Sequence, residues 1–191
     1  MELFENTRLK IGNSILLKRI ANIRRKIFYS NIGQIKIIGI VWDASKTQDF
    51  SSLSKFYQKM HERNIDVKIL GYYPGKELPN QYMAIRYLSC IRRKEINFFC
   101  IPVSTETNVF INTKFDVLID VNFEKSFPLF YITSMSSARF KVGLFNSQSG
   151  ESTFDLMIEL RKPVSIENYL EQVIHYLEMI KSGSSDQVYK Q

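Results

Sequence analysis

The stretch Ile35–Trp42, IKIIGIVW, is a nearly continuous apolar run rich in β-branched residues. Such a run is typical of a strand that is covered on both faces, as in parallel sheets. The polar turn DASKTQDF (residues 43–50) follows it, and Ser51 or Ser52 can cap the helix that comes next. This order of buried strand, polar turn and amphipathic helix predicts the opening of a layered α/β sheet.

The same alternation of strand-like and helix-like segments continues along the chain. The segment 81–95 fits either an irregular strand or a short helix. Pro128 falls in the first turn of a predicted helix, where its missing N–H is tolerated. The further predicted strands are 65–73, 97–102, 116–121, 140–145 and 154–160, and the further predicted helices are 126–138 and 165–181.

The predicted fold class is α/β: a single three-layer Rossmann-like domain with a mainly parallel sheet and a basic amphipathic N-terminal helix. The sequence shows no internal repeat and no linker that would divide it. We assign residues 1–34 to the N-terminal helix, 35–181 to the Rossmann-like domain and 182–191 to a polar flexible tail.

Length and composition exclude several classes of protein. The chain has 191 residues, 45% hydrophobic and 24% charged, which are ordinary values for a globular domain. No apolar run approaches the roughly 20 residues that span a bilayer. The apolar surroundings of Cys90 and Cys100 predict reduced, packed thiols. The N-terminus lacks the pattern of a secretory signal, so the expected location is the cytoplasm.

Positive charge is concentrated in the leading segment. Residues 1–36 hold eight basic and two acidic residues, a net of +6. The other 155 residues hold 18 basic and 17 acidic residues, a net of +1. A domain that binds nucleic acid over a broad face would spread its Lys and Arg over the body as well.

Within this segment, apolar residues recur at helical spacing and predict an amphipathic helix from about residue 6 to 28. The stripe consists of Leu9, Leu16, Ile20, Ile23 and Ile27. The candidate partner-binding residues, mostly off the stripe, are Lys18, Arg19, Arg24, Arg25 and Lys26. Three interpretations remain open: the stripe packs on the domain, the helix binds a partner or membrane surface, or its cations contact RNA or DNA.

The known signatures of cofactor and metal chemistry are missing. Neither GxGxxG nor a glycine-rich P-loop follows the first strand. The two histidines, His61 and His175, have no His or Cys neighbour at the spacing of metal ligands. GxSxG is also absent. We therefore expect no cofactor and no metal ion, and we assign no catalytic residue.

Ligands of parallel sheets bind beyond the carboxyl ends of the strands, near a change in strand order. This rule nominates the loops 43–47, 122–126 and 146–152. The candidate ligand-binding residues of the resulting crevice are Asp43, Lys46, Asp120, Asn122 and Ser126. Alternatively, Asp120 only caps or braces the loop 122–126, because a carboxylate buried at a strand end needs hydrogen-bond partners.

From Phe115 the chain reads FDVLIDVNFEKSFPLFYITSMSSARFKVGL. This unit resembles the N-terminal lobe of heptosyltransferase-type GT-B glycosyltransferases, where a similar D-L-V-I-D-L strand leads through a helix to a strand ending in R-V-G. The chain from about Ile35 to Ile180 is more similar to a bacterial family of unknown function with the same FD-x-LID-x-N and R-F-x-VG elements. The first resemblance implies a single lobe without a sugar-nucleotide site, and the second implies no known ligand.

Together these observations favour a non-catalytic binding or adaptor domain that meets a protein partner or an anionic surface through its N-terminal helix. One alternative is a sugar- or nucleotide-binding protein, or a small enzyme related to one GT-B lobe. Another is an RNA- or ribosome-associated protein.

Overall fold

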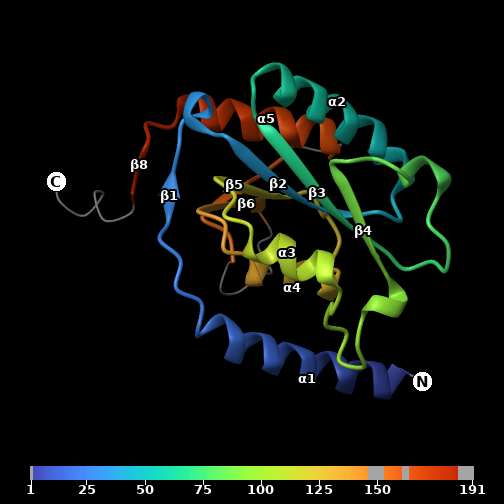
Figure 1. Cartoon of the computed structure of the whole chain (residues 1–191). Coiled ribbons are helices and arrows are strands. Elements are labelled where there is room, and N and C mark those ends of the chain that lie inside the picture. The colour runs from blue at the N-terminus through green and yellow to red at the C-terminus, as the bar shows by residue number, and fades with distance from the viewer. Residues whose placement is uncertain (1, 146–152, 161–163, 185–191) are drawn as a thin grey trace.

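The computed structural model describes residues 2–145, 153–160 and 164–184. Its centre is a six-stranded, fully parallel sheet with the strand order β4-β3-β2-β5-β6-β7 (Figure 1). The strands are β2 (Ile37–Asp43), β3 (Asp66–Tyr73), β4 (Leu88–Arg92), β5 (Val117–Asp120), β6 (Phe140–Leu144) and β7 (Leu156–Ile158). The α/β class with a parallel sheet is thus confirmed.

Helices cover both faces of the sheet (Figure 1). The helices α2 (Phe50–Glu62) and α5 (Ile166–Met179) pack side by side on one face, and α3 (Thr105–Asn112) and α4 (Phe127–Met135) lie on the other. The short helical turns are η1 (Ile32–Gln34), η2 (Thr47–Asp49), η3 (Asn80–Tyr82) and η4 (Arg93–Glu95). None of the helices in the described part of the chain has the length and apolar character needed to cross a membrane.

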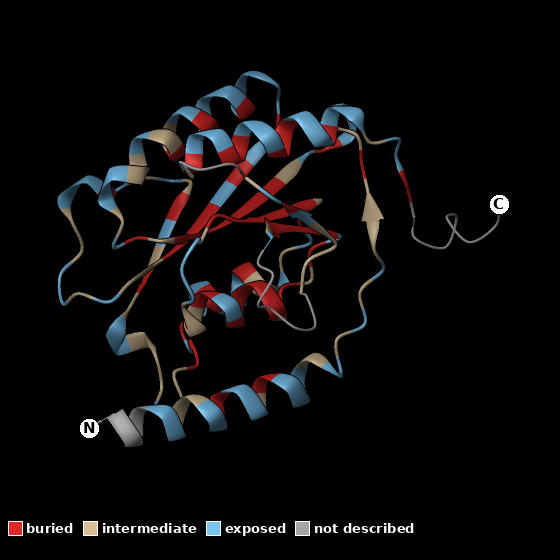
Figure 2. Cartoon of the chain, turned by 180° about the vertical axis from the view of Figure 1, so that it is seen from behind, coloured by how far each residue is buried: buried red, intermediate tan, exposed pale blue. Residues whose placement is uncertain are grey.

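The core divides into two layers because side chains of β2 alternate between the faces of the sheet. Ile38, Ile40 and Trp42 enter the larger layer beneath α2 and α5. Val41 enters the smaller layer beneath α3 and α4. The inner strands are buried along almost their whole length (Figure 2), as the apolar run at the start of the sheet predicts.

Two predicted strands differ from the structure. Residues 97–102 form a turn instead of a strand, with a single bridge from Ile96 to Pro102 and a positive φ at Cys100. The side chain of Asn97 stabilises this turn by accepting from the N–H groups of Phe99 and Ile101. The second difference concerns the predicted strand 154–160, of which only Leu156–Ile158 forms a strand, β7. The ambiguous segment 81–95 contains both η3 and the edge strand β4.

The predicted amphipathic helix over residues 6–28 is wrong in its extent. The helix α1 (Glu2–Ile20) ends before Arg24, Arg25 and Lys26. Among its residues 6–20 only Gly12 and Leu16 are buried, so the contact with the body is narrow. Leu16 joins Ile101 and Tyr131 in a small apolar cluster over α4. The helix therefore packs on its own domain, which is the first of the three interpretations above.

The segment after the first helix pairs with the segment after α5 through two short strands. The strand β1 (Phe28–Tyr29) pairs antiparallel with β8 (Gly183–Ser184). Residues 183 and 184 are thus part of a strand, although the sequence places them in a flexible tail. Residues 185–191 lie outside the described residues.

Candidate functional site

The carboxyl ends of β2 and β5 are the point where the strand order changes direction. From β2 the chain moves outward to β3 and β4, and it then returns to place β5 on the other side of β2. The loops that leave β2 and β5 therefore diverge, and such a divergence creates a crevice where parallel sheets bind ligands.

A cavity of about 240 Å³ occupies this crevice. Its size is somewhat below the roughly 300–1,000 Å³ of pockets for drug-sized ligands. The polar side chains that line it are Asp43, Lys46, Gln48, Asp49, Asn122, Glu124 and Ser165. Its apolar wall includes Trp42, Val121, Phe123 and Ile166, the last from the first turn of α5.

Asn122 lines this cavity and has a side-chain oxygen without a hydrogen-bond partner in the described residues. Its Nδ2 donates to the backbone oxygen of Val41 at 3.1 Å and to Oδ1 of Asp120 at 2.6 Å. Turning the amide over would place its oxygen against two acceptors, so the network fixes the orientation. The Oδ1 atom is buried and has no hydrogen-bond partner among the described residues. It is an acceptor without a donor.

Asp120 holds Asn122 in place through hydrogen bonds. Its Oδ1 also accepts from the backbone N–H of Asn122 at 3.0 Å, and its Oδ2 accepts from Oγ1 of Thr133 at 2.7 Å. Burial raises the pKa of the Asp120 carboxyl, and the hydrogen bonds from Thr133 and Asn122 act in the opposite direction. The contacts are those of a residue that braces the start of the loop after β5.

Trp42 contributes a free donor. Trp42 is only 1% exposed, and its buried indole Nε1–H has no hydrogen-bond partner among the described residues. A methyl group at Gly71 of β3 would lie 3.4 Å from Cε3 of the indole, so the six-membered ring faces β3. Trp42 is also among the residues that line the cavity.

A third unpartnered group lies close to the crevice. The buried hydroxyl of Tyr169 has no partner within the described residues. Burial raises its pKa well above 10, so the hydroxyl remains a donor at neutral pH. The ring of Phe123, which lines the cavity, meets the Tyr169 ring edge-on at 6.0 Å. Unpaired buried polar groups are rare in proteins and call for an explanation.

The charged side chains that line the cavity in the described part of the chain have a negative sum. Among these residues, Asp43, Asp49 and Glu124 contribute three carboxylates against the one ammonium group of Lys46, a net of two negative charges. Lys46 is already paired with Glu124, with 2.9 Å between Nζ and Oε1. Burial raises the pKa of the Asp49 carboxyl. A phosphate or carboxylate ligand would meet repulsion here.

The structure brings together three of the five candidate ligand-binding residues. Asp43, Lys46 and Asn122 line the cavity. Asp120 lies behind Asn122 and does not line it. Ser126 occupies the N-cap position of α4 without a capping hydrogen bond and is not among the lining residues. The nominated loop 146–152 lies outside the described residues.

Sequence reasoning missed the contributions of Trp42, Phe123 and the start of α5. Trp42 ends an apolar run, and that pattern predicts only a buried strand position. The contribution of α5 depends on how α5 crosses the sheet, which strand order determines and local patterns do not show. One signal was available, because Phe123 is an aromatic residue in an otherwise polar turn.

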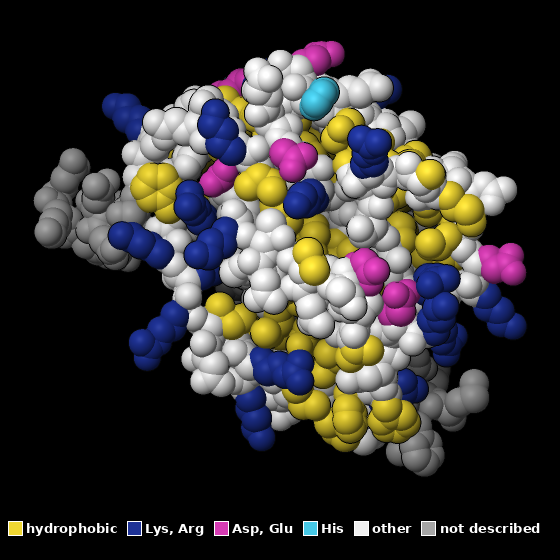
Figure 3. Space-filling model, in the orientation of Figure 1, with side chains coloured by type: hydrophobic (Ala, Val, Ile, Leu, Met, Phe, Trp, Pro, Cys, Tyr) yellow, Lys and Arg dark blue, Asp and Glu magenta, His cyan; other side chains and the backbone are white. Residues whose placement is uncertain are grey.

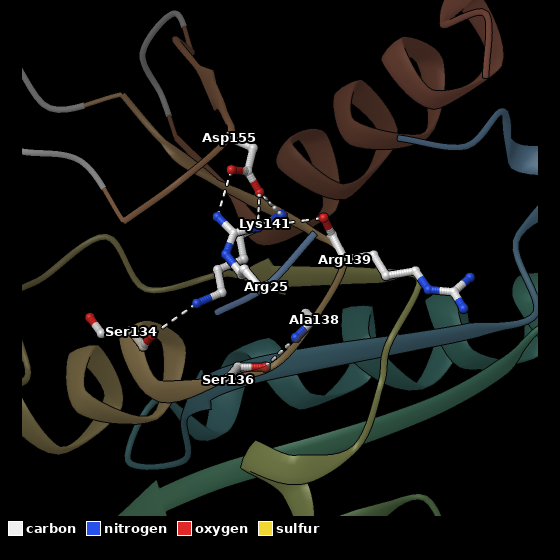
Figure 4. Close-up of polar contacts among 7 residues, drawn as sticks. All are labelled: Arg25, Ser134, Ser136, Ala138, Arg139, Lys141 and Asp155. Carbon is white, nitrogen blue, oxygen red and sulfur yellow. Dashed lines mark hydrogen bonds and ion pairs between the residues drawn. The ribbon is translucent and has the colours of Figure 1, made fainter. Parts of the chain in front are cut away.

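Two of the five candidate partner-binding residues make contacts within the chain. Arg25 forms two hydrogen bonds to Asp155, at 2.6 and 2.8 Å, and both side chains are largely buried (Figure 4). Arg19 donates to the hydroxyl of Tyr131. Lys18, Arg24 and Lys26 are exposed.

A buried lysine lies next to the Arg25–Asp155 pair. Lys141 of β6 is 2% exposed, and its Nζ donates to the backbone oxygen of Ser134 near the end of α4 at 2.9 Å (Figure 4). Burial, followed by the charge of Arg25, lowers the pKa of Lys141 to about 7, against the raising effect of Asp155.

We expect Lys141→Met to remove a pH dependence of stability. The folded protein releases the Lys141 proton near pH 7, whereas the unfolded chain holds it up to about pH 10.5. Between these values the unfolded chain binds more protons, so the free energy of unfolding of the wild type rises with pH. The difference in free energy of unfolding between the variant and the wild type should favour the variant most below pH 7. This difference should decrease by about a few kcal/mol between pH 7 and pH 10.5.

Urea denaturation at several pH values measures this difference. Lys68→Met, at an exposed position of β3, is the control and should follow the wild-type profile. Parallel profiles for Lys141→Met and the wild type would contradict the prediction.

The described residues contain no group of three or more His, Cys, Asp or Glu side chains that could hold a metal ion. A family model described as a family of unknown function (DUF6913) matches residues 8–180. The chain therefore belongs to this family, in agreement with the resemblance to a family of unknown function stated above. No curated protein matches the chain.

Proposed function

We propose that this member of a family of unknown function binds a small, neutral, hydroxyl-rich molecule of monosaccharide size in the crevice between β2 and β5. The observation that carries the proposal is the amide of Asn122, a residue that lines the cavity: Val41 and Asp120 hold the amide, and its Oδ1 has no partner among the described residues. A fixed acceptor without a donor is a preorganised contact for a ligand.

Hydroxyl groups suit this site because each of them both donates and accepts. One ligand hydroxyl can donate to Oδ1 of Asn122, and another can accept from the indole N–H of Trp42. The carboxylates of Asp43 and Asp49 are further acceptors at the rim. Val121, Phe123 and Ile166 provide apolar surface for the carbon skeleton of the ligand.

The charge of the crevice favours a neutral ligand over a sugar phosphate or a nucleotide. Among the described lining residues there are two surplus negative charges, and the one lysine in this set is paired with Glu124. The sequence analysis offers a sugar- or nucleotide-binding protein as one alternative, and the negative charge of the crevice favours the sugar. The adaptor hypothesis stays a prediction, but two of its five cations, Arg19 and Arg25, make contacts within the chain.

A thermal-shift screen tests the proposal. Neutral monosaccharides, amino sugars and sugar phosphates are compared, each up to millimolar concentration. A ligand at 100 times its Kd adds about 2.7 kcal/mol to the free energy of unfolding. For a chain of this size we expect a rise of roughly 5–10 °C in Tm for at least one neutral sugar.

Variants identify the site of binding. Asn122→Leu removes the free acceptor and should abolish the shift, whereas Asn13→Leu, on the exposed face of α1, should leave it unchanged. A shift with sugar phosphates alone, or one that survives Asn122→Leu, would contradict the proposal.

A further inference from the structure

Exposed basic residues gather at the amino end of the sheet, opposite the crevice. Figure 3 shows Lys and Arg side chains grouped on its left side, beside β1. We call this surface the amino-end patch. Its members, all exposed, are Arg24, Lys26, Lys36, Lys114 and Arg139.

Hydrogen bonds connect the segments that carry this patch. The backbone oxygen of Arg139 accepts from the N–H of Phe28, two residues after Lys26. The carboxylate of Asp116 accepts from the N–H of Lys36 at 2.8 Å and pairs with the Arg139 guanidinium at 3.1 Å. Lys114 precedes Asp116 by two residues. Four segments distant in sequence thus meet at one place.

The amino-end patch has a surplus of positive charge. Two acids belong to these segments: Asp116, which pairs with Arg139, and Asp66, whose N–H donates to the backbone oxygen of Lys36. Five cations and two carboxylates leave three positive charges. An exposed surface of this charge attracts a polyanion.

An aromatic pair accompanies the cations. The ring of Tyr29 packs against Phe140 at 6.2 Å, on the core side of β1. Because side chains of a strand alternate, the neighbouring Phe28 is directed to the other side. Phe28 is half-buried and lies two residues after the exposed Lys26. In the described residues the large exposed apolar side chains lie elsewhere, which disfavours insertion into a membrane.

We propose that the amino-end patch binds the backbone of single-stranded nucleic acid, with Phe28 as a stacking platform for a base. Cations that follow a phosphate backbone, together with an aromatic ring, are the two parts of sequence-independent single-strand binding. The site is independent of the crevice, because the two lie at opposite ends of β2.

Fluorescence anisotropy with a labelled oligouridylate of about 20 nucleotides tests this inference across a range of salt concentrations. Five phosphate contacts predict a slope of log K against log salt of about −3.5 for a single strand. The triple variant Lys26→Gln, Lys36→Gln, Lys114→Gln should reduce the magnitude of the slope by about 2. Phe28→Ala should lower the affinity roughly 5- to 100-fold at unchanged slope.

The matched control replaces three other exposed lysines, Lys59→Gln, Lys76→Gln and Lys94→Gln, and has the same net charge as the first triple variant. It should retain the wild-type slope. Circular dichroism of each variant checks that it is folded. Equal losses in both triple variants, no binding at low salt, or binding to phosphatidylserine vesicles without binding to the oligonucleotide would overturn the proposal.

Discussion

Asp155→Ala is expected to lower the free energy of unfolding by about 3–5 kcal/mol, because it leaves a largely buried arginine without its partner. Asp155 makes more than the ion pair with Arg25. Its Oδ2 also accepts from the backbone N–H of Lys141 at 2.8 Å. The exposed pair of Arg63 and Glu178 provides the control, and Glu178→Ala should change stability by less than about 1 kcal/mol.

The same substitution should release the segment that follows α1. Residues 21–27 are connected to the sheet through Arg25, so Asp155→Ala should make this segment a preferred site of limited proteolysis. The combined variant Arg25→Met, Asp155→Leu should be more stable than Asp155→Ala, because it removes both buried charges together. If Asp155→Ala unfolds no more easily than Glu178→Ala, the ion pair does not anchor the segment.

The second large effect concerns the residue that positions Asn122. Asp120→Ala removes the acceptor for two donors of Asn122, the backbone N–H and Nδ2. We expect ligand affinity in the crevice to fall at least roughly tenfold, since the orientation of the Asn122 amide is no longer fixed. We also expect a loss of about 1–3 kcal/mol in stability from the unpaired hydrogen-bonding groups left behind.

Asp120→Asn should rescue both properties. The amide oxygen can accept from Asn122, and the amide nitrogen can donate to the hydroxyl of Thr133, so every group stays paired. Burial raises the pKa of the Asp120 carboxyl above 3.8, so the folded protein loses stability as pH rises through that folded-state pKa. Relative to the wild type, Asp120→Asn should therefore gain stability at neutral pH and lose this advantage near pH 3.

Urea denaturation at the two pH values and titration of the sugar identified by the screen measure these effects. A drop in affinity for Asp120→Asn equal to that for Asp120→Ala would mean that the carboxylate itself, and not the placement of Asn122, is required.

The parallel sheet could be predicted because the information is local. The apolar run Ile35–Trp42 and the strand–helix unit from Phe115 each determine their own structure by periodicity and burial. The turn at residues 97–102 could not be predicted this way. Its apolar letters suit a strand, but the side-chain hydrogen bonds of Asn97 and the contact with α1 determine its shape.

At the candidate site, too, sequence patterns predict what is local and miss what depends on tertiary contacts. Position at the end of a strand was enough to nominate Asp43 and Asn122, since parallel strands bring such residues to one edge. The role of Trp42 depends on its buried N–H lacking a partner, and that follows only from tertiary packing. For Arg25, spacing along a predicted helix was misleading, because α1 ends at Ile20 and the partner Asp155 is 130 residues away.

The indole N–H of Trp42 offers the most direct test of the crevice. The chain has one tryptophan, so a ¹H–¹⁵N correlation spectrum contains one indole cross-peak, which needs no further assignment. Titration with the sugar found in the screen should move this peak downfield in proton shift, since the N–H gains an acceptor, and Asn122→Leu should suppress the movement. A sugar that stabilises the protein while this cross-peak stays in place would show that the ligand binds elsewhere.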